Sequence, residues 1–78
     1  MDKESLTTAE LIAFLKENPY METECRLLLG HKLGTTHYWY WDPKAQCLMH
    51  TRDWHFTPIS EHDAVASYEG CWWRIDQI

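Results

Sequence analysis

Histidine and cysteine are the side chains in this sequence best suited to metal binding or catalysis, and they are scattered. The chain has five histidines and three cysteines. Zinc takes such ligands in tetrahedral groups, whose sequence signals are short paired spacings. His50 and His55 in HTRDWH come nearest to that pattern, with His37 as a third ligand, but no cysteine lies at a paired spacing beside them. A small metal-binding domain on His37, His50 and His55 is therefore an alternative hypothesis, and the leading prediction includes no cofactor.

Nucleophilic catalysis has weaker support than metal binding. Cys47 with His37 or His50 would be the reactive pair, but the expected hairpin points Cys47 to the opposite face of the sheet. The sequence contains neither G-x-x-x-x-G-K nor G-x-G-x-x-G. A fold of 78 residues also has little room for the pocket of roughly 300 Å³ that an enclosed ligand needs. We therefore expect that the protein is not an enzyme.

The stretch THYWYWD places Tyr38, Trp39, Tyr40 and Trp41 in an unbroken aromatic run. Successive side chains of a strand point to opposite faces of the sheet, so a strand with one wet face alternates apolar and polar residues. Here both faces of the strand would be aromatic. The two interpretations are a core buried on both sides and an aromatic face left open for a partner.

The aromatic run is predicted to begin a hairpin whose turn spans residues 42–45. Asp at the first and Pro at the second position favour a type I turn. The symmetric register pairs Trp41 with Gln46 and His37 with His50, which sorts the side chains into two faces. The first face carries His37, Trp39, Trp41, Gln46, Leu48 and His50. The second face carries Thr36, Tyr38, Tyr40, Cys47, Met49 and Thr51.

Two helices are predicted to pack against the sheet. In LTTAELIAFLKENP, Thr7 and Glu10 have the spacing of a capping box, and Asn18-Pro19 ends the helix. Ser60 is the predicted N-cap of the second helix, and Gly70 follows its end. The buried side of the first helix is expected to hold Thr8, Leu11, Ile12, Phe14 and Leu15. The apolar side of the second is expected to hold Ala64, Val65 and Tyr68.

Three further stretches are predicted to be extended. Residues 24–29 form a short strand closed by Gly30, and RDWHFTP is a short extended piece. CWWRIDQI alternates, so Trp72, Arg74 and Asp76 point away from Cys71, Trp73 and Ile75. The predicted fold is α+β, a single globular domain over residues 1–78 in the order α-β-β-β-α-β, with a mostly antiparallel sheet packed by two short helices.

The charge balance disfavours two classes of partner. Twelve acidic and seven basic residues give a formal net charge of −5, which opposes contact with phosphate backbones and with anionic membranes. We therefore predict no direct nucleic-acid partner and no membrane. The N-terminal MDKESLTTAE lacks the apolar stretch of a signal peptide. Three cysteines without C-x-x-C are typical of free thiols, so a cytoplasmic location is expected.

Protein binding is the function that these observations favour. Tyrosine and tryptophan dominate the energetics of protein interfaces, and two short helices can cover one face of a small sheet. The sequence does not choose between Trp39/Trp41 and Tyr38/Tyr40 as the exposed pair. The predicted partner is a host protein or a second copy in a homodimer. The predicted partner-binding residues are Tyr38, Trp39, Tyr40, Trp41, Arg52, Trp72, Arg74 and Asp76.

Small size, acidity and the lack of catalytic motifs are typical of accessory proteins of phages and mobile elements. This composition leads to the hypothesis of a module that modulates or inhibits a host protein. A further alternative is an acidic mimic of nucleic acid that inhibits a DNA-binding enzyme, which would depend on carboxylates rather than on rings.

Overall fold

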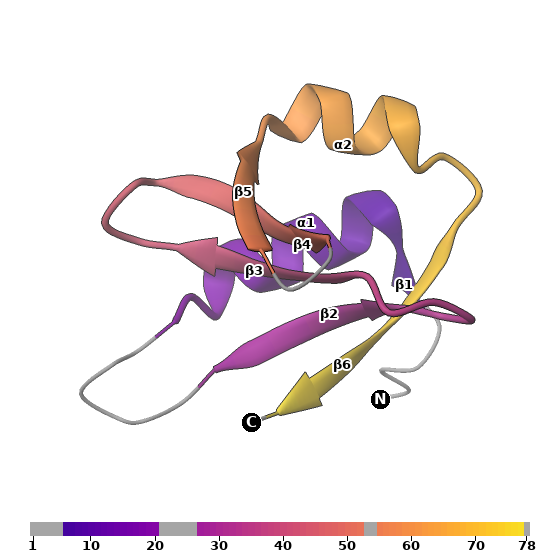
Figure 1. Cartoon of the computed structure of the whole chain (residues 1–78), viewed down its shortest axis with the longest axis horizontal. Helices are drawn as coiled ribbons and strands as arrows, with labels where there is room; N and C mark the ends of the chain where they lie inside the picture. Colours follow the sequence, from indigo (N-terminus) through magenta and orange to yellow (C-terminus); the bar gives the residue numbers. More distant parts are fainter. Residues whose placement is uncertain (1–5, 21–26, 53–54, 78) are drawn as a thin grey trace.

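An antiparallel sheet of six strands organises the computed structural model, which describes residues 6–20, 27–52 and 55–77 (Figure 1). The strand order is β1-β6-β2-β3-β4-β5, and all five neighbouring pairs are antiparallel. The described elements are β1 (Leu6–Thr7), α1 (Thr8–Glu17), β2 (Leu28–Lys32), β3 (Tyr38–Asp42), β4 (Cys47–Arg52), β5 (His55–Ile59), α2 (Glu61–Ser67) and β6 (Trp72–Gln77). The predicted α+β class is confirmed, and the expected extended piece proves to be a full strand, β5, paired with β4.

Side-chain caps begin both helices, as predicted. The backbone N–H of Glu10 donates to Thr7 Oγ1 at 3.2 Å, and the Glu10 carboxylate accepts the Thr7 N–H at 3.0 Å. At α2, the Ser60 hydroxyl accepts the N–H of Asp63 at 3.1 Å. These bonds satisfy N-terminal amides that have no partner within the helix.

The capping box makes the stability of α1 sensitive to acid. Hydrogen bonds from Thr7, the backbone one foremost, hold the pKa of the Glu10 carboxyl below its ordinary 4.5. The stabilisation is therefore present above pH 4.5 and is lost as the pH falls through the lower folded-state pKa. We expect the difference in thermal midpoint between wild type and Glu10→Gln to shrink on acidification. Glu17→Gln, which removes the same charge at the far end of α1, is the control; a difference for Glu10→Gln that is constant with pH would contradict this assignment.

Both helices pack on the same face of the sheet, and the core lies between. In Figure 1, α1 passes behind the strands and α2 lies above them. Trp39 of β3 and Trp73 of β6 are completely buried, with ring centroids 4.2 Å apart. Around these rings the core consists of Leu11, Ile12, Leu15, Leu48 and Ala64.

A short hydrogen-bond chain ties the core tryptophan of β6 to both helices. The indole N–H of Trp73 donates to Thr8 Oγ1 at 2.9 Å, and that hydroxyl donates to the Tyr68 carbonyl oxygen at 2.7 Å. The Tyr68 ring meets Trp39 edge to face at 5.1 Å. Every polar atom of this chain is thereby paired, which is what burial of an indole N–H and a hydroxyl requires.

The register of the hairpin differs from the predicted one by two residues. Asp42 pairs with Cys47 and Trp39 with His50, so the predicted pairings of Trp41 with Gln46 and of His37 with His50 are wrong. Gln46 belongs to the turn, because its φ of 52° is left-handed, and Asp42 Oδ1 accepts the turn amides of residues 44 and 45. A shift of two leaves every side chain on its predicted face, since only an odd shift exchanges the faces.

Two further expectations fail locally. Gly30 does not close a strand but lies in the middle of β2; residues 24–26 of the expected strand lie outside the described part of the chain. A Cβ atom on Gly30 would lie 2.6 Å from both Leu11 methyl carbons, so glycine here allows α1 to approach the sheet. The sequence places Val65 on the apolar side of α2, but its side chain is 42% exposed. Ala64 is the buried residue of this helix.

Candidate functional site

The sheet face opposite the helices is the candidate site, and we name it the open face. None of its side chains belongs to the core cluster that the helices form with the other face. Strand alternation and the observed register assign its members. They are Leu29, His31, Tyr38, Tyr40, Asp42, Cys47, Met49, Thr51, Phe56, Pro58, Trp72, Arg74 and Asp76.

A continuous row of side chains crosses the open face. Arg74, His31, Tyr38, Thr51 and Phe56 stand opposite one another on β6, β2, β3, β4 and β5. The His31 and Tyr38 rings stack with centroids 4.6 Å apart. Thr51 is only 8% exposed between its larger neighbours. The row therefore connects a cationic end at β6 with an apolar end at β5.

The apolar end of the open face is an aromatic cluster with a small hollow. Tyr40 meets Phe56 edge to face at 5.0 Å and Tyr20 at 6.5 Å. These three rings and Leu27 line a hollow of about 180 Å³. Tyr20 is held there because its backbone N–H donates to the Trp41 carbonyl oxygen at 3.2 Å. Phe56 is 45% exposed and Tyr20 39%, so the cluster faces solvent.

The tyrosine at the centre of this cluster is partly desolvated. Burial, and then the charge of Asp42, raise the pKa of the Tyr40 hydroxyl above its ordinary 10.0. A tyrosine with a raised pKa stays protonated at neutral pH and can donate a hydrogen bond to a partner.

The charged end of the open face is organised around a carboxylate. Asp76 Oδ1 lies 3.1 Å from Arg74 Nε, and Oδ2 lies 3.5 Å from His31 Nδ1. Both nitrogens are enclosed, and neither makes a hydrogen bond of good geometry. Arg74 and Asp76 form an ion pair, whereas the contact with His31 is an ion pair only when the ring carries both protons. His31 Nε2 is engaged by the Thr35 carbonyl oxygen, which can only accept, so Nε2 carries a proton. A histidine held in this way cannot serve as a general base through Nε2.

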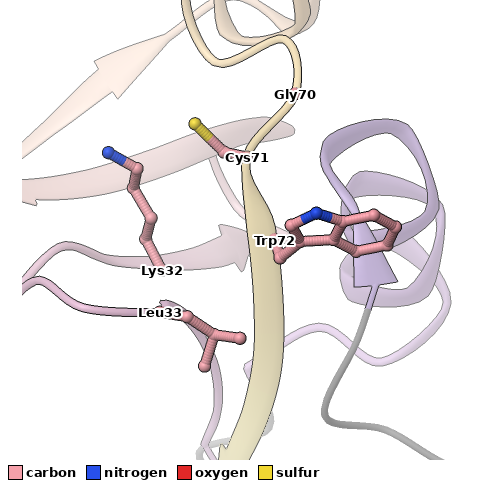
Figure 2. A pocket seen from close by; sticks show the side chains of 5 residues that line it. All are labelled: Lys32, Leu33, Gly70, Cys71 and Trp72. Carbon is pink, nitrogen blue, oxygen red and sulfur yellow. The ribbon is translucent and has the colours of Figure 1, made fainter.

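A groove lies at the start of β6, beside the end of β2 (Figure 2). Its volume is about 560 Å³. Figure 2 shows the Trp72 ring on one side of β6 and the Cys71 and Lys32 side chains on the other. The side chains of Trp72 and Leu33 are 52% and 41% exposed. The Lys32 ammonium lies 5.5 Å from the centre of the Tyr68 ring. The groove thus offers exposed apolar surface at its rim, continuous with the open face through Trp72.

The structure separates the predicted binding residues into two groups. Trp39 is completely buried, and half-buried Trp41 packs on the core with the Lys16 ammonium 5.4 Å from its ring centre. We therefore remove both tryptophans from the predicted binding set, because the helices cover their face. Arg52 is part of β4, but its side chain lies outside the described atoms. The open face retains Tyr38, Tyr40, Trp72, Arg74 and Asp76.

Two members of the aromatic cluster were not predicted as binding residues. Phe56 lies on β5, whose sequence is HFTPI. Strand alternation places Phe56 and Pro58 on the same face, and this pattern could have predicted where the Phe56 ring points. Tyr20 follows Asn18-Pro19 and carries no periodic signal at all. Its position depends on a hydrogen bond to the carbonyl oxygen of Trp41 on β3, a residue 21 positions later in the sequence.

The histidines of the metal hypothesis do not share a common contact in the described part of the chain. The His37 ring lies 6.3 Å from the Tyr68 ring, and His50 Nε2 hydrogen-bonds with Thr57 Oγ1 at 2.6 Å. His55 begins β5. Within residues 6–20, 27–52 and 55–77, no three His, Cys, Asp or Glu side chains are placed to hold one metal ion. The geometry therefore does not favour a site on His37, His50 and His55.

Neither helix of the described chain has the length and apolar character needed to cross a membrane. Comparisons of the sequence and structure with family models, curated proteins and solved structures give no match. The role of the open face must accordingly be inferred from its own residues.

Proposed function

We propose that this chain binds another protein through its open face. The observation that carries the proposal is the exposure of Trp72 and Phe56, at 52% and 45%, on a sheet face that neither helix covers. Exposed large aromatic rings thus lie toward both ends of the open face, with three strands between Trp72 on β6 and Phe56 on β5. Large exposed apolar surface on a small protein is typical of an interaction site. Tryptophan, tyrosine and arginine, all present on this face, are the residues that contribute most to interface affinity.

The aromatic hollow and the cations favour a protein partner over an enclosed small molecule or a nucleic acid. The hollow of about 180 Å³ is smaller than the roughly 300–1,000 Å³ of ligand pockets. The groove of about 560 Å³ lies within that range, but its rim consists of the exposed side chains of Trp72 and Leu33, which suit a broad protein contact. Stacking of nucleic-acid bases on strand aromatics also requires cations for the phosphates. Arg74 is paired with Asp76, and Lys32 lies against Tyr68. Lys16 pairs with Glu61 on the helix side of the sheet.

The setting that fits this activity is an accessory protein in the cytoplasm that modulates or inhibits a host protein. Cys47 and Cys71 are free, half-buried thiols, which a reducing compartment preserves. The mimic hypothesis would place the interaction on carboxylates instead. Exposed acids of α1 and α2 lie on the opposite side of the molecule, namely Glu10, Glu17, Glu61 and Asp63.

Trp72→Ala is the variant that tests the open face. We expect it to weaken binding about 30-fold or more, the effect of losing a central aromatic anchor worth about 2 kcal/mol. Its thermal midpoint should stay within a few degrees of wild type, because the ring is half exposed. The measurement is retention of a bacterial-lysate protein on the immobilised chain, followed by titration with the purified partner.

Val65→Ala is the matched control, since Val65 is 42% exposed but lies on α2. It should retain the partner. Loss of the partner in Val65→Ala but not in Trp72→Ala would move the binding surface to the helices. Binding that fades with rising salt and survives Trp72→Ala would favour the nucleic-acid mimic instead.

A further inference from the structure

We propose that the partner of the open face is a second copy of this chain. Two sheets would pack face to face about a twofold axis, with the helices outside. This inference rests on the proposed function, because it assigns an occupant to the same surface. The four-layer dimer would take the order helices, sheet, sheet, helices.

In the described part of the chain, both helices pack on one face of the sheet, and the other face has no helical layer. An antiparallel sheet with one wet face alternates apolar and polar residues. Here the face away from the helices carries Tyr38, Tyr40, Met49 and Phe56, while the helix face holds the core. Both described helices lie on one side, because residues of α1 and Ala64 of α2 belong to one core cluster. A second sheet with the same composition supplies the missing layer at the usual spacing of about 10 Å.

Charge is distributed so that this face can meet a copy of itself. The formal net charge of −5 disfavours association in general. The described exposed acids of the helical side are Glu10, Glu17, Glu61, Asp63 and Glu69. The open face carries Asp76 paired with Arg74, and Asp42 at the hairpin end, where it accepts turn amides. Sheets packed face to face keep the helical acids farther apart than the Debye length of about 8 Å.

Opposite charges on β6 make the face self-complementary. Arg74 and Asp76 are two residues apart on one strand, and their side chains are 43% and 32% exposed. In a twofold interface, a contact from residue i to residue j is repeated from j to i. An axis passing between these positions therefore brings each Arg74 toward the partner's Asp76, giving two intermolecular ion pairs.

The β5 edge of the sheet is a poorer site for self-association than its face. There β5 contains Pro58, which has no N–H to donate to a neighbouring strand. Edge prolines are a device that prevents strand addition.

The size of the surface suits a weak dimer. The exposed portions of Trp72, Phe56 and Tyr20 amount to about 250–300 Å², taking roughly 200 Å² for each ring. Stable interfaces bury about 800 Å² on each partner, so the half-buried residues of the face must contribute the remainder. We expect a dimer that forms in the micromolar range.

The test is the molar mass in solution, measured by light scattering and sedimentation from about 1 μM to about 500 μM chain. Wild type should approach twice the 9.4 kDa of the chain. Phe56→Arg and Trp72→Ala should remain monomeric, whereas Val65→Arg, on α2, should dimerise as wild type does. A wild-type monomer at every concentration, or a dimer unaffected by Phe56→Arg and Trp72→Ala, overturns the inference.

Mixing two charge variants tests the self-complementary pair. Arg74→Asp and Asp76→Arg should each weaken self-association, and an equimolar mixture should restore a dimer containing one chain of each. Variants that are folded by circular dichroism but fail to associate on mixing would overturn the proposed ion pairs.

The outcomes also separate this inference from the proposed function. A monomer that binds a different protein in a Trp72-dependent manner overturns the second copy alone. A monomer whose binding is indifferent to Trp72 and Phe56 overturns both proposals.

Discussion

Replacing Trp73 with alanine is expected to unfold most of the domain at 37 °C. The ring is completely buried, stacks 4.2 Å from Trp39 and donates its indole N–H to Thr8 at 2.9 Å. Truncating a buried tryptophan costs about 3–5 kcal/mol, and Thr8 loses its donor as well. Domains have a free energy of unfolding of only about 5–15 kcal/mol, and small domains lie at the low end of that range. The expected loss is therefore close to the entire free energy of unfolding of this domain.

The measurement is urea unfolding followed by far-ultraviolet circular dichroism, with Trp72→Ala as the control one residue away. Trp72 is 52% exposed, so its truncation should cost less than about 1 kcal/mol. Trp73→Phe keeps much of the apolar volume and should lose less than Trp73→Ala. Equal destabilisation by Trp72→Ala and Trp73→Ala would contradict the assignment of the two faces.

The different fates of Trp72 and Trp73 could be predicted from the sequence because the information is local. Strand alternation places the two rings on opposite faces, and Arg74 and Asp76 mark the side of Trp72 as the polar one. The helix starts were predictable for the same reason, since the capping box of Thr7 and Glu10 requires only residues within one turn.

The hairpin register was predictable in parity but not in detail. Asp42-Pro43 correctly indicated a turn, but nothing in the sequence marks Gln46 as left-handed. Glutamine has no special preference for positive φ, unlike glycine or asparagine. Gln46 belongs to the turn because the Asp42 carboxylate accepts hydrogen bonds from the turn amides. As a result, every cross-strand pair of the hairpin is shifted by two residues from the predicted register.

The composition of the open face depended on contacts between distant residues. Alternation showed that Tyr38 and Trp39 point in opposite directions, but not which of them meets the helices. That choice follows from α1 packing on the Trp39 side. The joining of Tyr20 to Tyr40 and Phe56 likewise brings together three segments of the chain. No pattern within a single segment encodes such a cluster.

Gly30→Ala is expected to destabilise the domain by about 1–3 kcal/mol, the usual cost of overpacking. The added Cβ would lie 2.6 Å from both Leu11 methyl carbons and 3.0 Å from Leu11 Cγ. Leu11 is completely buried, so it cannot move into solvent to make room. Alanine normally stabilises a strand relative to glycine by about 0.5–1 kcal/mol, so a loss here would reveal the steric conflict with α1.

A double-mutant cycle identifies the cause of that loss. Leu11→Ala alone leaves a cavity and should cost about 2–5 kcal/mol. In Leu11→Ala with Gly30→Ala, the new methyl group occupies part of the vacated space, so the combined loss should fall short of the sum by about 0.5–3 kcal/mol. Leu15→Ala is the matched control, because Leu15 is equally buried on α1 but is not among the atoms nearest to Gly30. Its loss should add to that of Gly30→Ala, and coupling of equal size in both cycles would show that Gly30 acts through the strand rather than through Leu11.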